Sequence, residues 1–398
     1  MDLLVLHASC GGGHRAAAGA LEKAFRAVAP GMGVEVEDAL DHMSLPFRAT
    51  YARAFEAVVT RAPRLYGALF RATANLDRRR WFRALRSAWN GLNDGGLRAL
   101  LRESQPRAVV CTHFLPLEVA LRAQRGSSFE GRVYSVVTDH VVHGLWRQPG
   151  AALTICAPGR SRYDLARASI EGARVLGTGI PIDPSWGLAY DARTAKARAG
   201  FEDRPVVLVL AGGTGLGPLV SVVREAGALL AGRATLVAVC GRNERLRAEA
   251  EREARRAGPH VRVLGFVDPL VELVRAADVV VTKPGALTTN ECLAAGKAIV
   301  FYEAAPGQET ENARFAVERG AALDGRTAAG AAASALRLVI DAALRRQLER
   351  RALVISRPAS ALDAAVAIAS HVEGREVVSR PVTASSRSAS RPRLTRIA

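Results

Sequence analysis

The chain has 398 residues, of which 49% are hydrophobic and 23% are charged, and this balance excludes a disordered or collagen-like protein. The length suits two α/β domains of roughly 180 residues each. The five cysteines lie far apart with no CxxC pair, which argues against a disulfide framework or a zinc knuckle and fits a reducing cytosol. No apolar run approaches the roughly 18–20 residues that span a bilayer, so we expect no transmembrane helix.

The net charge is +17, from 55 basic and 38 acidic residues, and 51 of the basic residues are arginine. This excess of arginine indicates a GC-rich genome, so the position of the charge is more informative than its total. Between Arg48 and Arg107 there are 13 arginines against four acidic residues. Such a patch attracts phosphate, either of nucleic acid or of an anionic membrane. No RNP aromatic motif, zinc finger or helix-turn-helix signature accompanies it, so we expect no nucleic-acid partner.

The first half of the chain alternates between strand-like and helical stretches, as a parallel sheet requires. Asp2–Ser9 is an apolar run that ends in three glycines, and the helical stretch His14–Val28 follows. The exception to this alternation is Pro46–Leu101, which we expect to be helical throughout. Further strands are predicted at Val34–Glu37, Ala108–Cys111, Val133–Val137 and Leu153–Cys156.

The segment Gly179-Ile180-Pro181-Ile182-Asp183-Pro184 interrupts the alternation, because two prolines and a glycine continue neither a strand nor a helix. A second series of strands and helices starts after it. We therefore expect two Rossmann-like domains, residues 1–180 and 181–373, that face each other across an interdomain cleft. Residues 374–398 hold six arginines and five serines without an apolar period, and we interpret them as a disordered basic tail. The predicted strands of the second domain are Val206–Leu210, Thr235–Cys240, Val261–Leu264, Val279–Val281 and Ala298–Tyr302.

The turn Gly11-Gly12-Gly13-His14 joins the first strand to the first helix. Glycines at this place let a ligand approach the backbone, and a helix start offers free N–H donors. His14 would then lie at the edge of the cleft, within reach of a substrate hydroxyl. The alternative is a tight turn in which the histidine only caps the helix.

Two turns of the second domain also have the composition of a phosphate or sugar site. Gly212-Gly213-Thr214-Gly215 lacks a strict GxGxxG pattern, and no Walker A sequence occurs in the chain. In Thr282-Lys283-Pro284-Gly285, a lysine precedes a helix start, where its ammonium and the helix dipole both favour a phosphate. Glu291, one turn into that helix, is placed to accept hydrogen bonds from vicinal ribose hydroxyls, although it can equally be a solvated helix residue.

The segment Pro306-Gly307-Gln308-Glu309 again places polar side chains at a helix start. Gln308 and Glu309 are candidates for sugar recognition, and an acidic helix start that only complements the dipole is the alternative. No D-x-D pair occurs in the chain, and Mg²⁺-dependent sugar-nucleotide enzymes commonly use such a pair. We therefore predict no metal and no cofactor. Helix dipoles and Lys283 would instead hold the diphosphate of a sugar nucleotide.

Taken together, these motifs resemble the monogalactosyldiacylglycerol synthase and processive diacylglycerol glucosyltransferase family, part of glycosyltransferase family 28. The resemblance rests on HASCGGGHRAAAGAL, TDHVVHGLW, GIPIDP, KPGALTTNE and PGQETENARF, in this order. It implies a GT-B fold, a UDP-sugar donor bound by the C-terminal half and a lipid acceptor brought by the N-terminal half. It also implies that His14 is the catalytic base, with Asp139 as a second catalytic residue. The donor residues that it implies are Gly212, Gly213, Thr214, Arg242, Phe266, Val267, Lys283, Gly285, Thr288, Glu291, Gly307, Gln308 and Glu309.

The long helical insert, residues 46–101, is the second functional feature. Phe47, Tyr51 and Phe55 recur at helical spacing, as do Trp81, Leu85 and Trp89. Arginine beside tryptophan on one helix surface is typical of a segment that lies in a membrane interface. The alternative is a helical hairpin packed on its own domain. The residues expected at the acceptor or the membrane are Gly12, Gly13, His143, Trp146, Arg78, Arg79, Arg80, Trp81 and Trp89.

The sequence thus predicts an inverting glycosyltransferase that moves a hexose from UDP-glucose or UDP-galactose to diacylglycerol. We expect it to be peripheral, on the cytoplasmic face of the cell membrane, and to contact anionic lipids. One alternative is a transferase that uses UDP-N-acetylglucosamine and a polyprenyl-linked lipid. A second alternative is a non-catalytic UDP-sugar sensor.

Overall fold

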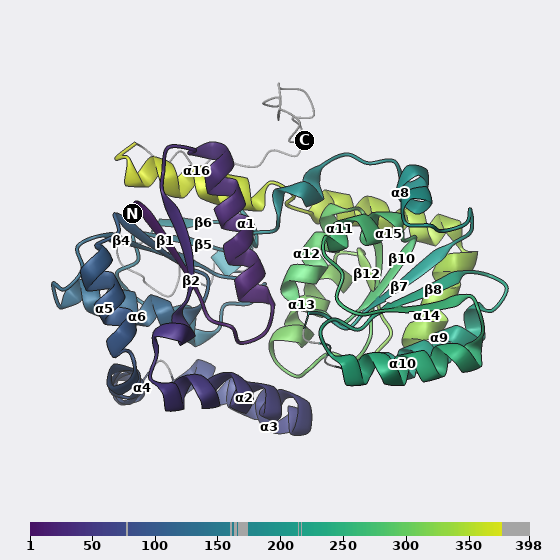
Figure 1. Cartoon of the computed structure of the whole chain (residues 1–398), viewed down its shortest axis with the longest axis horizontal. Helices are drawn as coiled ribbons and strands as arrows, with labels where there is room; N and C mark the ends of the chain where they lie inside the picture. The colour runs from purple at the N-terminus through teal and green to yellow at the C-terminus, as the bar shows by residue number, and fades with distance from the viewer. Residues whose placement is uncertain are drawn as a thin grey trace.

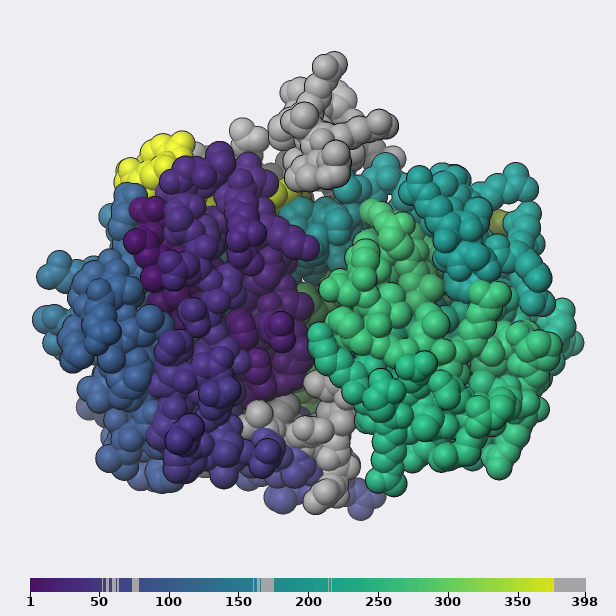
Figure 2. All heavy atoms as spheres, viewed as in Figure 1, coloured from purple at the N-terminus to yellow at the C-terminus, as the bar shows by residue number. Residues whose placement is uncertain are grey.

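The structure is a computed structural model that describes residues 1–76, 79–159, 161–162, 165, 174–213, 215 and 217–375. Within these residues, two parallel sheets of six strands each form the centres of two domains that lie side by side (Figure 1). In the space-filling view the N-terminal domain, in purple and blue, and the C-terminal domain, in green, meet along a groove (Figure 2). The predicted pair of Rossmann-like domains facing each other across a cleft is therefore confirmed.

The N-terminal sheet has the strand order β2-β1-β3-β4-β5-β6. Its central strands are continuous apolar runs, because helices cover both faces of a parallel sheet and leave no solvent side. The strands are β1 (Leu3–His7), β2 (Val34–Asp38), β3 (Ala108–Cys111), β4 (Arg132–Val136), β5 (Leu153–Ile155) and β6 (Arg174–Leu176). The helices are α1 (Gly13–Val28), α2 (Leu45–Arg61), α3 (Pro63–Leu76), α4 (Arg80–Asn93), α5 (Gly95–Ser104) and α6 (Phe114–Arg125). The short 3-10 turns are η1 (Ala39–His42) and η2 (Gly144–Trp146).

The C-terminal sheet has the order β12-β11-β10-β7-β8-β9, which is the strand order of a dinucleotide-binding Rossmann domain. The strands are β7 (Val206–Leu210), β8 (Thr235–Val239), β9 (Val261–Leu264), β10 (Val279–Thr282), β11 (Ala298–Phe301) and β12 (Ala322–Asp324). The helices are α8 (Ala192–Arg198), α9 (Leu219–Leu230), α10 (Glu244–Ala257), α11 (Leu270–Ala276), α12 (Ala286–Ala294), α13 (Gln308–Val317), α14 (Ala328–Ile340) and α15 (Ala342–Ile355). The 3-10 turn η3 (Pro184–Gly187) precedes them.

The last helix, α16 (Ser360–Val372), returns to the N-terminal domain and packs beside α1 (Figure 1). Its alanines share a hydrophobic cluster with Leu21 and Phe25 of α1. The Ser360 hydroxyl donates to the Ile180 carbonyl over 2.8 Å, so the two segments that connect the domains, one near Ile180 and one before α16, lie side by side. The expected second domain, 181–373, is corrected accordingly, because its last helix completes the core of the first domain.

One segment, Ala342–Val372, passes a length and composition test for a membrane span, with a mean hydropathy of 1.5 over an 18-residue window. We did not expect such a segment from the apolar runs. In the structure it is divided into α15 and α16, which pack on different domains, and half of the window is buried. Buried alanines of both helices, Ala352 in α15 and Ala364 and Ala365 in α16, lie in the cores of the two domains.

Candidate active site

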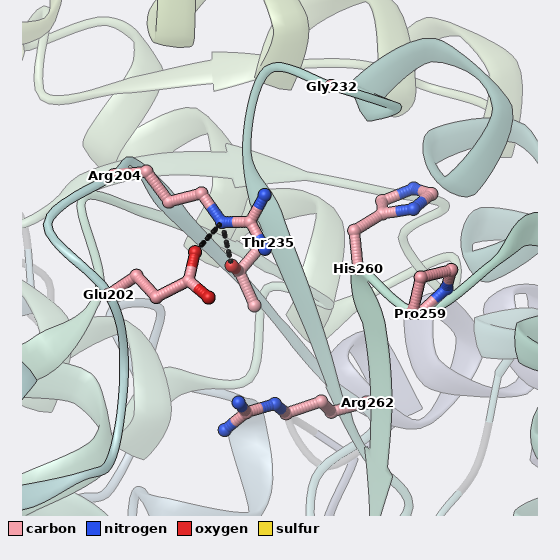
Figure 3. Close-up of a pocket in the computed structure, with 7 residues that line it drawn as sticks. All are labelled: Glu202, Arg204, Gly232, Thr235, Pro259, His260 and Arg262. Atoms are coloured by element: carbon pink, nitrogen blue, oxygen red, sulfur yellow. Dashed lines mark hydrogen bonds and ion pairs between the residues drawn. The ribbon is translucent and has the colours of Figure 1, made fainter.

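A cavity of about 410 Å³ opens at the amino ends of β7, β8 and β9 (Figure 3). Its polar groups bind one another: Arg204 Nε donates to Thr235 Oγ1 over 2.9 Å and lies 3.2 Å from a Glu202 carboxylate oxygen. His260 Nε2 lies 2.8 Å from the Gly227 carbonyl. Ligands of doubly wound sheets bind at the carboxyl ends of the strands, where the strand order reverses. The candidate site therefore lies at the opposite ends of these strands.

In the N-terminal sheet the order reverses between β1 and β3, and His14 lies at this point. Its Nδ1 is 2.7 Å from the backbone carbonyl of Thr112, which follows β3, and 3.0 Å from the hydroxyl of Thr138, which follows β4. The Thr112 hydroxyl in turn donates to the His14 carbonyl over 3.0 Å. These contacts join the first turn of α1 to the ends of two strands and hold the imidazole in one orientation.

The contact with Thr112 also fixes the tautomer of His14. A carbonyl oxygen only accepts, so Nδ1 carries the proton and Nε2 keeps a free lone pair. Burial lowers the pKa of His14 to about 4, because desolvation disfavours the charged ring, while the bond to Thr112 acts in the opposite direction. His14 is therefore neutral near pH 7 and able to accept a proton at Nε2.

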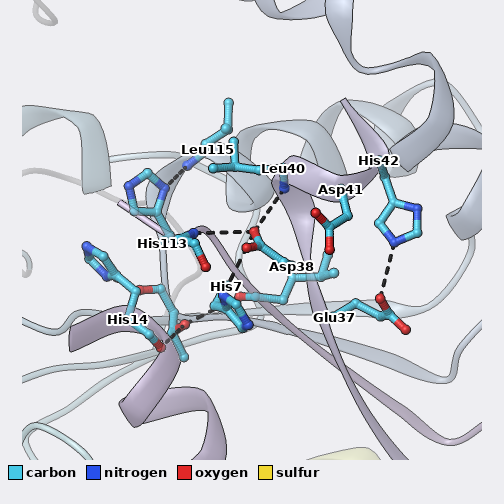
Figure 4. Close-up of polar contacts among 12 residues, drawn as sticks. His7, His14, Glu37, Asp38, Leu40, Asp41, His42, His113 and Leu115 are labelled. Carbon is cyan, nitrogen blue, oxygen red and sulfur yellow. Dashed lines mark hydrogen bonds and ion pairs between the residues drawn. The ribbon is translucent and has the colours of Figure 1, made fainter. Parts of the chain in front are cut away.

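Two further histidines stand beside His14 (Figure 4). The His113 ring meets the His14 ring edge-on with centroids 4.6 Å apart, and its Nδ1 accepts from the Leu115 backbone N–H at the start of α6. His7, at the end of β1, has its Nδ1 3.9 Å from a carboxylate oxygen of Asp38. Burial lowers the pKa of both rings, so neither adds a positive charge beside His14 at neutral pH.

In the C-terminal sheet the order reverses between β7 and β10, and Gly212 and Lys283 follow these two strands. The lysine stem lies close to the turn, since a Cβ added to Gly212 would be 3.2 Å from Lys283 Cε. Lys283 Nζ is 3.2 Å from a carboxylate oxygen of Glu309. The Arg242 backbone N–H donates to the Gly213 carbonyl over 3.3 Å, which ties this turn to the loop after β8. A cation and exposed backbone at the carboxyl ends of strands are suited to bind a phosphate.

Helix α12 begins beside this lysine, and its N-cap is Gly285, which has no side chain to cap the first N–H groups. Thr288 is half-buried in the first turn, and Glu291 follows within the helix. Burial raises the pKa of Glu291 to about 7, and the negative charge of Asp183 adds to this effect. Within the described part of the chain, the Glu291 carboxyl has no hydrogen-bond donor, so its oxygens can accept from a ligand.

Gln308, the first residue of α13, connects the two domains. Its Nε2 donates to Asp139 Oδ2 over 2.7 Å, and its Oε1 accepts from the Tyr66 hydroxyl over 3.0 Å. Burial raises the pKa of Asp139 to about 6, although hydrogen bonds from Asn312 and Gln308 lower it in part. Because Asp139 and Tyr66 belong to the N-terminal domain, the Gln308 side chain of the C-terminal domain is in direct contact with the N-terminal domain.

The starts of α1 and α12 also touch across the cleft. A Cβ added to Gly13 would lie 3.6 Å from Leu287 Cδ2, and Ala17 shares a hydrophobic cluster with Ala286 and Leu287. His14 is the next residue after this contact. The start of α1, which carries His14, therefore adjoins the helix that carries Glu291.

Two family models match the chain in succession. The monogalactosyldiacylglycerol synthase model matches residues 14–182, and the model of the glycosyltransferase family 28 C-terminal domain matches residues 206–346. The chain is thus similar to the monogalactosyldiacylglycerol synthase family in its N-terminal half and to glycosyltransferase family 28 in its C-terminal half. The resemblance seen in the sequence motifs is confirmed.

The curated relatives of the chain include two enzymes named processive diacylglycerol beta-glucosyltransferase. The chain is 29% identical to the enzyme from Bacillus subtilis over 225 residues, which cover 56% of the chain and 58% of that protein. It is 26% identical to the one from Bacillus cereus strain B4264 over 285 residues, which cover 71% of the chain and 72% of that protein. The first match thus spans less than two thirds of its relative.

Solved structures resemble the chain in fold. MurG from Acinetobacter baumannii has a TM-score of 0.56 at 16% identity and covers 92% of this chain and 98% of its own. HepE from Anabaena, solved in complex with UDP-glucose, has a TM-score of 0.55 at 15% identity over 94% of this chain and 98% of its own. A putative UDP-N-acetylglucosamine 2-epimerase from Listeria monocytogenes has a TM-score of 0.64 at 13% identity, covering 96% of this chain and 100% of its own. The expected GT-B fold is confirmed.

Most of the residues that were expected to bind the UDP-sugar lie at the carboxyl ends of the strands in the second sheet. Arg242 stacks on the exposed Phe266 ring, 3.7 Å from its centroid, and Val267 follows in the same loop. Gly307 is the N-cap of α13, directly before Gln308. Lys283 and Glu309 were expected to bind phosphate and sugar, and in this structure they pair with each other instead. Thr214 lies outside the described residues.

Of the residues expected at the acceptor or the membrane, some lie at the cleft and others in the core of the N-terminal domain. Gly12 and Gly13 form the start of α1 at the cleft. The expectation for Trp146 is corrected: its side chain is 1% exposed and packs edge-on against Phe114 in the core, so it presents no surface to a lipid. His143 Nε2 lies 2.9 Å from the Phe70 carbonyl, which fastens α3 to the N-terminal domain.

The helical insert has a buried part and an exposed part. Phe47 is 5% exposed and stacks on Tyr51, so the expected membrane role of α2 is corrected to packing on its own domain. Trp81 and Trp89 of α4 are each 60% exposed. Arg79 and Arg80 are exposed beside them, whereas Arg78 lies outside the described residues.

Several residues at the domain contact were not predicted from the sequence. Asn290 Nδ2 donates to the Ala286 carbonyl over 2.7 Å and lies 2.9 Å from His140 Nε2. The His140 backbone N–H lies 3.3 Å from Asn312 Oδ1, and its ring stacks on Phe315 with centroids 3.7 Å apart. The contacts of His140 with Asn290, Asn312 and Phe315 join the two domains, and the local sequence carries no periodicity or motif for them.

Proposed function

We propose that this chain is an inverting glycosyltransferase that moves a hexose from a UDP-sugar to diacylglycerol and so makes a membrane glycolipid. The observation that supports the proposal is the contact between the starts of α1 and α12, because His14 directly follows Gly13 in α1, and Glu291 lies in α12 with Lys283 just before it. The names of the curated relatives support diacylglycerol as the acceptor and glucose as one candidate sugar.

In this mechanism the acceptor hydroxyl oxygen attacks the anomeric carbon from the face opposite the UDP. A bond forms between that oxygen and the anomeric carbon while the bond from the same carbon to the diphosphate oxygen breaks. His14 Nε2 takes the hydroxyl proton, because its lone pair is free and Nδ1 is occupied by Thr112. UDP leaves with the electron pair of the broken bond, and the sugar configuration at the anomeric carbon is inverted.

The leaving diphosphate needs positive charge, and we propose that this chain's own groups supply it without a metal ion. Lys283 lies beside the Gly212 turn, and α12, whose N-cap is Gly285, begins shortly after it in the chain. In this structure Lys283 pairs with Glu309. We propose that the lysine exchanges this carboxylate for the diphosphate, and that Glu309 then turns to a sugar hydroxyl.

The acceptor is a lipid, and α4 offers a surface for a membrane. Its inner side is polar: Arg86 and Asn90 both donate to Glu118 of α6, over 2.8 and 3.1 Å. Its outer side carries the exposed apolar residues Trp81, Leu85, Trp89 and Leu92, which we call the α4 stripe. A helix that is polar toward its own domain and apolar toward solvent fits a membrane interface. Arg79, Arg80 and Arg83 are exposed at the start of the same helix and favour anionic lipids, and we propose peripheral attachment to the cytoplasmic face of the cell membrane.

The decisive experiment offers diacylglycerol in anionic vesicles together with UDP-glucose, UDP-galactose or UDP-N-acetylglucosamine, and identifies the lipid products by mass spectrometry. We expect a hexosyl-diacylglycerol with one of the two UDP-hexoses and none with the His14→Ala variant. A product formed only from UDP-N-acetylglucosamine and a polyprenyl lipid would replace this proposal by the alternative transferase. Binding of UDP-sugars without any transfer would favour the sensor.

A further inference from the structure

Helix α3 of the insert reaches across the cleft and touches the loop that precedes α13. A Cβ added to Gly67 would lie 2.6 Å from Pro306 Cβ, and one added to Gly307 would lie 3.0 Å from the Phe70 ring. The α3 backbone at Gly67 therefore packs on the Pro306 side chain, and the loop backbone at Gly307 packs on the Phe70 ring; a side chain at position 67 would overlap Pro306. The contact places the Tyr66 hydroxyl 3.0 Å from Gln308 Oε1.

The far end of α3 is fixed to the acceptor-side domain. His143 Nε2 lies 2.9 Å from the Phe70 carbonyl and 3.2 Å from the Thr73 hydroxyl, and its ring packs on Phe70 with centroids 4.6 Å apart. The position of Tyr66 is thus set by the N-terminal domain. Through Tyr66, that domain acts on a side chain at the start of α13.

The two partners of Gln308 also define which way its amide faces. The Asp139 carboxylate only accepts, so it binds the amide nitrogen and sets the orientation, and in that orientation the Tyr66 hydroxyl donates to the amide oxygen. These bonds occupy one lone pair of the oxygen and one hydrogen of the nitrogen. Within the described residues, one acceptor and one donor position of the amide remain for a ligand, in directions that the two bonds fix. A fixed donor beside a fixed acceptor distinguishes hexoses that differ in the direction of a single hydroxyl.

We propose that Tyr66 is a positioning residue for the donor sugar, which acts through Gln308 and makes helix α3 part of the site that selects the hexose. This inference rests on the proposed function, in which Gln308 binds the sugar of the UDP-hexose. Asp139 is the second support of the same amide. Tyr66 itself touches neither the sugar nor the reacting atoms.

The test compares Tyr66→Phe, Gln308→Leu, the double variant and the matched control Tyr51→Phe, whose ring stacks on Phe47 in α2 away from the donor loop. Affinities for UDP, UDP-glucose and UDP-galactose are measured by calorimetry, so the result does not depend on turnover. Loss of one neutral hydrogen bond predicts that Tyr66→Phe weakens the better UDP-hexose about 2- to 12-fold. The affinity for UDP, which lacks the hexose, should stay within about twofold of the wild-type value. The ratio between the affinities for UDP-glucose and UDP-galactose should come closer to one.

The double variant decides whether Tyr66 acts through Gln308. If it does, the double variant binds the UDP-hexoses no more weakly than Gln308→Leu alone, because the interaction is already lost. Independent, additive losses would overturn the proposal, and so would an equal loss of UDP affinity or a Tyr66→Phe variant that behaves like Tyr51→Phe. Gly67→Ala, which separates α3 from the loop without removing the hydroxyl, should lower UDP-hexose affinity in the same selective way. Absence of hexosyl transfer by the wild type would refute the proposed function, while these affinities would still decide the role of Tyr66.

Discussion

The Nδ1 of His14 lies 2.7 Å from the carbonyl oxygen of Thr112, which joins the first turn of α1 to the end of β3. This contact fixes both the orientation and the tautomer of the imidazole without a carboxylate partner. Burial lowers the pKa of this base to about 4, although the bond to Thr112 acts in the opposite direction, so the ring is unprotonated across the physiological range. Such a base does not remove the acceptor proton in advance, and it accepts the proton as the hydroxyl attacks the anomeric carbon.

The first prediction concerns this base. His14→Ala should lower the rate of transfer to diacylglycerol by about 10²- to 10⁴-fold, the usual contribution of general base catalysis. The affinity for UDP, measured by calorimetry, should remain unchanged because the donor residues belong to the other domain. A variant that keeps wild-type turnover would show that His14 only caps α1.

The second prediction concerns the protonation of Glu291, whose pKa of about 7 leaves it mostly protonated near pH 6 in the free protein. When ribose hydroxyls donate to the ionised carboxylate, they lower its pKa, so UDP binding near pH 6 should release protons. Above about pH 8 the group is already ionised and the release should vanish. Calorimetry in buffers with different ionisation enthalpies measures this proton count.

Glu291→Gln is the control for that measurement. It should abolish the proton release near pH 6 and weaken UDP about 5- to 150-fold, because hydroxyl groups lose a charged acceptor. Release that persists unchanged in Glu291→Gln would assign the titration to another group, such as Asp139, whose pKa is about 6. UDP affinity equal to the wild type would remove Glu291 from the donor site.

Much of the donor site follows from the sequence, because the carboxyl ends of parallel strands meet at one edge of a sheet. The turn at Gly212 and the lysine at position 283 follow two separate strands, β7 and β10. The register pairs Leu210 with Thr282, so the residues that follow them become neighbours. Recognition of strand, glycine turn and helix start was sufficient to place them together.

Contacts between the domains could not be predicted in this way. The bonds from Gln308 to Asp139 and Tyr66 depend on how two separately folded sheets face each other, which no local pattern records. The burial of Trp146 was missed for a related reason. An aromatic residue in a polar, glycine-containing loop resembles a surface anchor until the neighbouring Phe114 is known to cover it.

The third prediction concerns the charge of the leaving group. If Lys283 and the start of α12 hold the diphosphate, transfer should continue in EDTA and change little when Mg²⁺ is added. Lys283→Met should raise the KM for the UDP-sugar about 10- to 150-fold, as expected for loss of a hydrogen bond to a charged group. Arg193→Met, which removes a cation from an exposed pair with Asp203, is the control and should leave KM unchanged. Activity that disappears with chelator and returns with Mn²⁺ would mean that a metal ion performs this task.

The fourth prediction concerns the α4 stripe, where Trp81 and Trp89 are each 60% exposed although Arg86 and Asn90 of the same helix bind Glu118 of α6. Replacing both tryptophans with serine should weaken binding to vesicles by about 2 kcal/mol for each indole that no longer enters the interface. The loss should occur on neutral and on anionic vesicles alike, because it is apolar in origin. Charge reversal at Arg79 and Arg80 should act only on anionic vesicles, by about 1 kcal/mol for each arginine removed, and should diminish with added salt.

The two kinds of variant therefore separate the apolar and the electrostatic parts of membrane binding in one flotation assay. Ile340→Ser, at the end of α14, is the matched control because Ile340 is 67% exposed and lies on the other domain. It should leave flotation unchanged. Turnover of a short-chain diacylglycerol dispersed in detergent should survive all of these changes, since His14 and Glu291 lie in the cleft. If the tryptophan variant instead floats like the wild type and loses turnover in detergent, the stripe serves folding or a protein contact, and membrane attachment must come from another surface.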